Sequence, residues 1–139
     1  MPPTRCVVVW DKMQPWENFS QVELAWTSFD RPATIYRKSN FESGKIHPTQ
    51  KPVELYAWLV SKFAQPGMRV LDTHVGSASS LIAFHRAGLE YWGFEIDEEY
   101  YRTASQRLNK EKSQINMFEA EKQKKPEEIS KNLSFFDDF

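Results

Sequence analysis

The chain has 139 residues, of which 40% are hydrophobic, and its 18 basic and 19 acidic side chains nearly cancel. Such a length and composition fit one globular domain of ordinary charge. The sequence contains no apolar run of about 18 residues and no secretory signal at its N-terminus, so it predicts a cytoplasmic protein that does not enter a membrane. One cysteine and three scattered histidines offer no cluster with the spacing of a metal site.

Charge is distributed unevenly along the chain. Residues 1–69 carry 9 basic and 6 acidic side chains, whereas residues 70–139 carry 9 basic and 13 acidic ones. Because an excess of positive charge attracts a polyanion, the N-terminal half is the better candidate for such a contact.

The N-terminal half contains two runs that are typical of strands. Residues 6–10 and 33–37 are predicted to be strands, and the polar segment 38–45 is predicted to be a loop. Between the two strands lies a stretch rich in aromatic residues, where no regular element is predicted. Its aromatic side chains are a hypothetical contact surface for nucleic-acid bases or a partner. They are Trp16, Phe19, Trp26 and Phe29.

From residue 52 onward, helical and strand patterns alternate. Apolar residues recur at helical spacing up to residue 63, and Pro52 suits the first turn of a helix. The elements expected after this helix are a strand over 69–72, a helix over 77–87 closed by Gly88, a strand over 91–95 and a helix over 97–108. This alternation predicts an α/β fold with a parallel sheet and crossover helices, and it places Trp58 and Trp92 in the core.

The composition changes again after residue 108. Eleven of the 22 residues from 110 to 131 are charged, and almost no apolar periodicity remains. We therefore expect a folded domain over residues 1–108 and a flexible or marginally helical charged tail over residues 109–139.

One strand-to-helix turn carries the strongest indication of a binding site. Asp72 ends a predicted strand, and Gly76 and Ser77 follow at the edge where open α/β sheets bind ligands. Glu95 ends the next strand, where a carboxylate can accept hydrogen bonds from two ribose hydroxyls. The full dinucleotide fingerprint is absent, which favours a nucleoside without pyrophosphate, such as S-adenosylmethionine. The alternative is that Asp72 caps its own turn and that Glu95 and Asp97 cap the last helix.

Three blocks follow one another in order: His-Pro-Thr-Gln-Lys-Pro at 47–52, Leu-Asp-x-x-x-Gly-Ser at 71–77, and Gly-Phe-Glu-Ile-Asp-Glu-Glu-Tyr at 93–100. Together they resemble the amino-group DNA methyltransferases, which modify adenine or cytosine. The resemblance implies an incomplete Rossmann-like fold that binds S-adenosylmethionine. The cofactor-binding residues it implies are His47, Thr49, Lys51, Asp72, Gly76, Ser77, Glu95 and Asp97.

Two features depart from the pattern of that family. Its usual Asp-Pro-Phe is Asp72-Thr73-His74 here, so an imidazole would replace an aromatic contact to the cofactor. The catalytic block, an Asp, Asn or Ser followed by Pro-Pro and an aromatic residue, does not occur, because the one Pro-Pro lies at residues 2–3 and precedes Thr4. In the family this block holds the target amino group and stacks on the flipped base. No catalytic residue is therefore assigned.

The chain thus resembles the C-terminal half of a bacterial or phage methyltransferase. We expect it to contact DNA through its N-terminal half, with adenine as the expected base to be methylated. We also expect it to be inactive alone or to require a complementary chain that carries the catalytic block. The alternative is a non-catalytic methyltransferase remnant that acts as an interaction protein.

Residues 132–136 resemble the peptide with which replication proteins bind the bacterial sliding clamp, and Leu133, Phe135 and Phe136 would make that contact. The other possibility is that these side chains fold back onto the domain.

Overall fold

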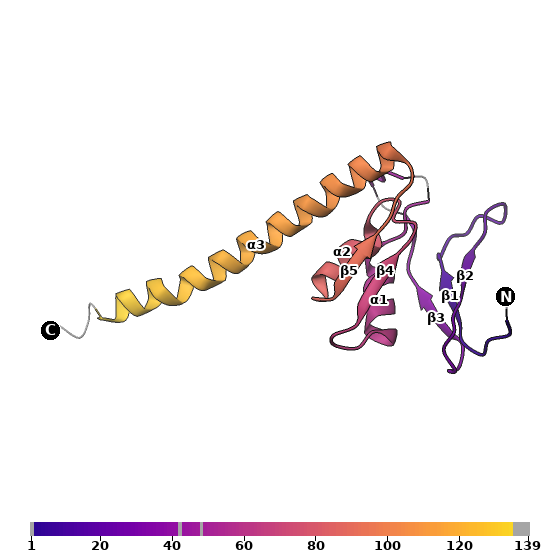
Figure 1. Cartoon of the computed structure of the whole chain (residues 1–139), viewed down its shortest axis with the longest axis horizontal. Coiled ribbons are helices and arrows are strands. Elements are labelled where there is room, and N and C mark those ends of the chain that lie inside the picture. Colours follow the sequence, from indigo (N-terminus) through magenta and orange to yellow (C-terminus); the bar gives the residue numbers. More distant parts are fainter. Residues whose placement is uncertain (1, 42, 48, 135–139) are drawn as a thin grey trace.

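The computed structural model describes residues 2–41, 43–47 and 49–134, which form two small sheets and three helices (Figure 1). In chain order the elements are β1 (Val7–Asp11), β2 (Val22–Trp26), β3 (Thr34–Arg37), α1 (Val53–Phe63), β4 (Arg69–Asp72), α2 (Ser79–Arg86), β5 (Glu90–Gly93) and α3 (Glu98–Ser134). None of the helices in these ranges combines the length and the apolar character that a membrane crossing requires.

β1 is the central strand of the N-terminal sheet. It pairs antiparallel with β2 and parallel with β3. Val8 and Trp10 alternate along β1 and are both buried. Tyr36 is the cross-strand partner of Trp10 and stacks on Trp58 of α1 with ring centroids 5.0 Å apart. Because cross-strand partners share one face of a sheet, α1 covers the face that holds Trp10.

β4 and β5 form the second sheet, and α2 connects these parallel strands as a crossover helix. Ala78, Leu81 and Ala104 form a buried cluster where α2 and α3 meet β5. Gly93 allows this close packing, because a Cβ at this position would lie 2.5 Å from Cγ2 of Val75 and 2.8 Å from Cδ1 of Leu81.

α3 begins after Asp97, whose Oδ1 accepts a hydrogen bond of 2.9 Å from the backbone N–H of Tyr100. This is the geometry of an N-cap, so the predicted cap is confirmed. The helix then continues to Ser134 and extends away from the two sheets (Figure 1). Its predicted end at residue 108 is wrong, since the Glu, Lys and Gln residues that follow are strong helix formers and need no apolar face to remain helical. The division of the chain at residue 108 stays a prediction.

The remaining predicted elements are confirmed to within about two residues at each end, and the α/β fold class is confirmed with them. Three expectations are wrong. β2 lies in the aromatic-rich stretch, where no strand was predicted, and it pairs antiparallel. The strands form two sheets instead of one. Trp92, expected in the core, is 47% exposed, because its face of the second sheet is uncovered.

Candidate cofactor site

Asp72 holds the turn that follows β4. Its Oδ1 accepts a hydrogen bond of 2.9 Å from the backbone N–H of His74, and its Oδ2 accepts one from the hydroxyl of Ser80. Both oxygens are therefore engaged within the protein. These are the bonds expected if Asp72 caps its own turn, so this side chain acts on the site by shaping the loop.

Glu95 follows β5 and faces the same turn. Its Oε2 accepts a hydrogen bond of 2.8 Å from the backbone N–H of Gly76, and its Oε1 accepts one of 3.0 Å from the N–H of Asp97. The backbone N–H groups of Asp97 and Gly76 hold the pKa of the Glu95 carboxyl below its usual value. The carboxylate is thus ionised and fixed in orientation, and each oxygen keeps a further lone pair for a ligand.

His47 lies across the turn from Glu95. Its ring packs on Tyr100 of α3 with centroids 4.2 Å apart, and its Nδ1 accepts a hydrogen bond of 3.2 Å from the backbone N–H of Thr49. Gly76 has a φ of +54°, and a Cβ there would lie 3.8 Å from the His47 ring. Glycine suits this left-handed conformation, and its missing side chain keeps the space beside His47 open.

Lys51 and Lys12 share the carboxylate of Glu23 on β2. The Nζ of Lys51 lies 3.0 Å from Oε2 of Glu23, and the Nζ of Lys12 lies 3.0 Å from its Oε1. Partial burial acts to raise the pKa of Glu23, but the two lysines outweigh this effect and the pKa lies below its usual value. The ion pairs join Lys51 to the N-terminal sheet and limit the positions its ammonium group can take.

A cleft of about 280 Å³ brings together most of the predicted cofactor-binding residues. Those that line it are His47, Thr49, Lys51, Gly76, Ser77 and Glu95. Its volume is close to the lower end, about 300 Å³, of the usual range for pockets that bind small organic molecules. With a carboxylate, an ammonium group and imidazoles around a glycine turn, the cleft can bind a ligand that carries hydroxyl groups at one end and a carboxylate at the other. We call it the cofactor cleft.

Two predicted cofactor-binding residues, Asp72 and Asp97, are not among the residues that line the cofactor cleft. Asp97 caps α3 with its side chain and donates its backbone N–H to Glu95. Both aspartates are placed to support the cleft through neighbouring groups. At the other end of the chain, Phe135 and Phe136 lie outside the described residues, and Leu133 is described only by its place in the backbone of α3.

Sequence reasoning missed several residues of the cleft. Tyr56 lines it from α1, and burial, reinforced by the charges of Asp72 and Glu23, raises the pKa of Tyr56 to about 12. Its helical spacing had identified it only as an apolar position. Gln50 is buried in the cleft wall, and its place inside the His-Pro-Thr-Gln-Lys-Pro block was the available signal. His74 also lines the cleft. It was not named among the cofactor-binding residues, although the change from Asp-Pro-Phe to Asp72-Thr73-His74 implied an imidazole at this place.

The predicted base-contact surface is partly exposed. Trp16 and Phe19 lie in the connection from β1 to β2 and are 64% and 68% exposed. Two basic side chains near the aromatic stretch bond within the chain, because Arg31 donates a hydrogen bond of 2.7 Å to the carbonyl of Lys62 and Lys12 pairs with Glu23. Contact of this stretch with bases therefore stays a prediction.

Comparison with protein families assigns the chain to a class. Residues 7–107 match the family described as DNA methylase. The chain belongs to this family of amino-group DNA methyltransferases. The matched range contains β1 to β5 and the start of α3, and it includes every residue that lines the cofactor cleft.

Two curated relatives and one solved structure illustrate the similarity. YubD of Escherichia coli (strain K12) is 38% identical over 68 residues, which are 49% of this chain and 30% of YubD. YhdJ of the same strain, a DNA adenine methyltransferase, is 28% identical over 98 residues, which are 70% of this chain and 32% of YhdJ. The crystal structure of M1.HpyAVI with SAM has a TM-score of 0.58 at 22% identity, and the match covers 73% of this chain and 60% of that one. The fold is thus an incomplete Rossmann-like methyltransferase fold, and the chain spans about a third of the length of these curated relatives.

Proposed function

We propose that the chain is the S-adenosylmethionine-binding part of a DNA amino-methyltransferase. The observation that carries the proposal is the carboxylate of Glu95, which Gly76 and Asp97 fix at the cofactor cleft in its ionised form. A carboxylate in this position after a strand suits the two hydroxyls of a ribose. Membership of the DNA methylase family and the complex of M1.HpyAVI with SAM support the same ligand.

The other groups of the cleft fit this cofactor. Gly76 allows the backbone to approach a nucleoside, and His74 offers an aromatic surface in the cleft. The ammonium group of Lys51 is available to the carboxylate of the methionine end, because an ion pair with one half-exposed glutamate leaves donor capacity on Nζ. When bound, the cofactor supplies an activated methyl group, and the residues of this chain bind and orient it.

Methyl transfer requires groups that these residues do not include. The family's catalytic block is not found in the 139 residues, so we propose that they are inactive alone or act with a complementary polypeptide that carries the block. DNA is the proposed substrate, approached from the N-terminal half, in the cytoplasm of a bacterial or phage-infected cell. Adenine is the proposed target base, which the similarity to the DNA adenine methyltransferase YhdJ supports.

Calorimetric titration with S-adenosylmethionine tests the cofactor assignment. The wild-type chain should bind with one site, and Glu95→Gln should weaken binding about tenfold or more, because an amide accepts fewer hydrogen bonds from the ribose. Glu90→Gln is the matched control, since Glu90 is an exposed carboxylate on β5 outside the cleft. Absence of binding at high micromolar protein, or equal affinity of the Glu95 and Glu90 variants, would contradict the assignment.

A second candidate function rests on the sequence of residues 132–136. A terminal Leu and Phe peptide on a long charged helix could bind the sliding clamp, with the methyltransferase domain retained as a non-catalytic remnant. The double variant Leu133→Ala/Phe136→Ala should abolish retention on immobilised clamp. Retention equal to that of the wild-type chain would remove this candidate.

A further inference from the structure

Two lysines and one glutamate form a row of charges that leads from the N-terminal sheet to the cofactor cleft. Glu23 lies in the middle, with its Oε1 3.0 Å from the Nζ of Lys12 and its Oε2 3.0 Å from the Nζ of Lys51. Of the three residues, Lys51 alone lines the cofactor cleft. We call Lys12, Glu23 and Lys51 the charge triad. Its two ammonium groups and one carboxylate leave one net positive charge.

Lys12 is the least exposed member of the charge triad. Its side chain is 12% exposed, against 34% for Lys51 and 39% for Glu23. Its Nζ lies 5.8 Å from the centroid of the buried Trp10 ring, and its backbone N–H donates a hydrogen bond of 2.9 Å to the carbonyl of Gln21. A charge removed from water in this way requires a partner of opposite charge, and it offers little surface to a phosphate group of DNA. Lys12 therefore acts on the rest of the molecule through Glu23.

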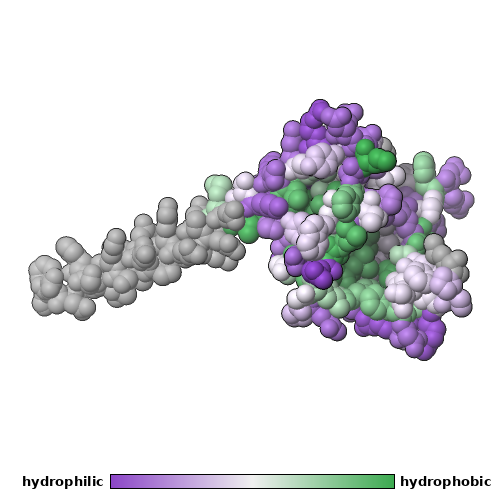
Figure 2. Space-filling view, viewed as in Figure 1, coloured by the Kyte–Doolittle hydropathy of each residue, from purple (hydrophilic) through white to green (hydrophobic). Residues whose placement is uncertain are grey.

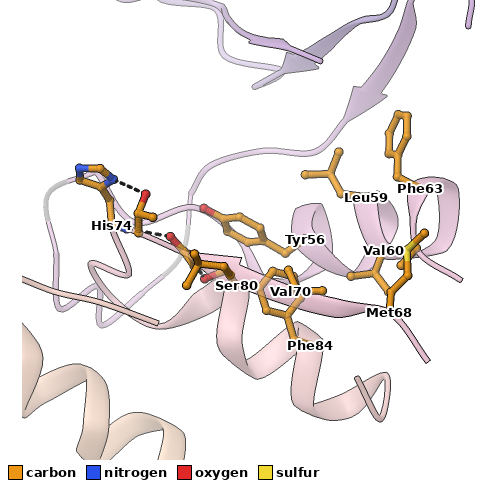
Figure 3. Close-up of a pocket in the computed structure, with 13 residues that line it drawn as sticks. Tyr56, Leu59, Val60, Phe63, Met68, Val70, His74, Ser80 and Phe84 are labelled. Carbon is orange, nitrogen blue, oxygen red and sulfur yellow. Dashed lines mark hydrogen bonds between the residues drawn. The ribbon is translucent and has the colours of Figure 1, made fainter. Parts of the chain in front are cut away.

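The charge of Glu23 reaches the cofactor cleft. Burial and the charges of Asp72 and Glu23 together raise the pKa of Tyr56, which lines the cleft, to about 12. Figure 3 shows Tyr56 extending from α1 toward the turn that carries His74, and both residues also line an apolar groove beside the cleft. Figure 2 shows hydrophobic residues around a hollow on the face of the molecule toward the viewer. Apolar surroundings screen charges less than water does, so a change in the balance of the triad should be felt in the cleft.

We propose that Lys12 is a positioning residue for the cofactor. By sharing the carboxylate of Glu23, it leaves the positive charge of Lys51 available to the carboxylate at the methionine end of S-adenosylmethionine. Without Lys12, Lys51 and Glu23 would form a neutral pair, and the carboxylate of Glu23 would repel that of the ligand. This inference rests on the proposed function and adds to it a residue outside the cleft.

The competing role of the charge triad is structural. The same ion pairs join β2 to the residues that follow β1 and to those that precede α1, and they could serve folding alone. In that case a loss of Lys12 would affect every ligand of the cleft alike. The test therefore compares two ligands that differ by one carboxylate.

The probes are S-adenosylmethionine and decarboxylated S-adenosylmethionine, which lacks the carboxylate of the methionine end. Lys12→Met removes the charge and keeps an unbranched apolar stem near Trp10. In calorimetric titrations this variant should bind S-adenosylmethionine about fivefold more weakly than the wild-type chain, and it should bind the decarboxylated compound no more weakly. The double variant Lys12→Met/Glu23→Gln returns the triad to one net positive charge, so its affinity for S-adenosylmethionine should return to about that of the wild-type chain.

Lys38→Met is the matched control. It removes a lysine charge from an ion pair of 3.1 Å with Glu54, and neither residue lines the cofactor cleft. This variant should bind both compounds like the wild-type chain. The far-ultraviolet circular dichroism of each variant verifies folding, and Lys12→Gln replaces Lys12→Met if the latter does not fold.

Two results would overturn the inference. The first is an affinity of Lys12→Met for S-adenosylmethionine that equals that of the wild-type chain, or an equal loss of affinity for both compounds. The second is a double variant that binds as weakly as Lys12→Met, since a structural role predicts no rescue by Glu23→Gln. If the wild-type chain binds neither compound, the proposed function fails together with the inference, whereas wild-type binding without these differences contradicts the inference alone.

Discussion

The cofactor cleft adjoins an apolar groove of about 470 Å³ that side chains of α1, β4 and α2 line, and Tyr56 and His74 belong to both. The two sites differ in the chemistry of the groups that line them. In the cleft, both carboxylate oxygens of Glu95 accept hydrogen bonds from backbone N–H groups of the chain. Most side chains that line the groove are apolar, among them Leu59, Val60 and Val70. The turn and the carboxylate of the cleft are thus held in place by hydrogen bonds, whereas the lining of the groove is mainly apolar. The proposed cofactor site is therefore polar and held in place by hydrogen bonds, and an apolar surface adjoins it.

Gly93→Ala should have the largest effect, because Gly93 lies where β5 packs against residues next to the cofactor cleft. The added methyl group would overlap Val75 and Leu81, and overpacking of this kind costs roughly 1–3 kcal/mol of stability. The midpoint of urea denaturation should fall accordingly, with an unchanged slope. An unchanged midpoint would show that the β4–β5 unit is not packed closely around Gly93.

Gly76→Ala should have the next largest effect and should act on both stability and binding. Its left-handed backbone would cost a side chain about 1–2 kcal/mol, and the methyl group would fill the space beside His47. Gly88→Ala is the control, because Gly88 has a φ of +66° and nothing lies near its added Cβ. Both variants should lose similar stability in urea, but Gly76→Ala alone should weaken S-adenosylmethionine binding. Equal affinity of the two variants for S-adenosylmethionine would show that the Gly76 turn does not take part in binding it.

Arg107→Gln tests whether α3 stabilises the turn beside the cofactor cleft. The Arg107 guanidinium donates hydrogen bonds of 2.7 Å to the carbonyl of Ser77 and 2.8 Å to the hydroxyl of Ser79. Losing them should cost about 1 kcal/mol and lower the melting temperature. Arg102→Gln, which removes an exposed ion pair with Glu98, should change the melting temperature far less. A melting temperature equal in the two variants would mean that α3 does not brace the turn.

Glu23→Gln should have the smallest effect on folding stability, and this effect should depend on pH. The pKa of Glu23 is lowered in the folded chain, so its contribution to stability is present above the ordinary carboxyl value of 4.5 and is lost as the pH falls through the lower folded value. Melting curves should show the wild-type chain more stable than the variant at neutral pH, with the difference vanishing in acid. A difference that stays constant down to acid pH would contradict ionic pairing of Glu23 with Lys12 and Lys51.

The sequence predicted the cleft better than its surroundings, for physical reasons. The Gly76 turn and Glu95 follow strands directly, so local pattern and spacing were enough to bring them together. β2 was missed because its residues alternate on a sheet whose outer face is exposed, and Leu24 and Trp26 therefore show no burial pattern. Trp92 was assigned to the core because sequence periodicity cannot show whether another element packs on that face of the sheet. Tyr56 joined the cleft only through the packing of α1, which depends on contacts distant in the sequence.

The central claim, that the cleft around Glu95 and the Gly76 turn binds S-adenosylmethionine, is tested most directly by amide chemical shifts of the labelled chain. Addition of S-adenosylmethionine should shift the resonances of Gly76 and Asp97, whose N–H groups bond to Glu95, and leave that of Leu71 in place. Shifts of Leu71 with cofactor alone, or unchanged resonances at Gly76 and Asp97, would contradict the account.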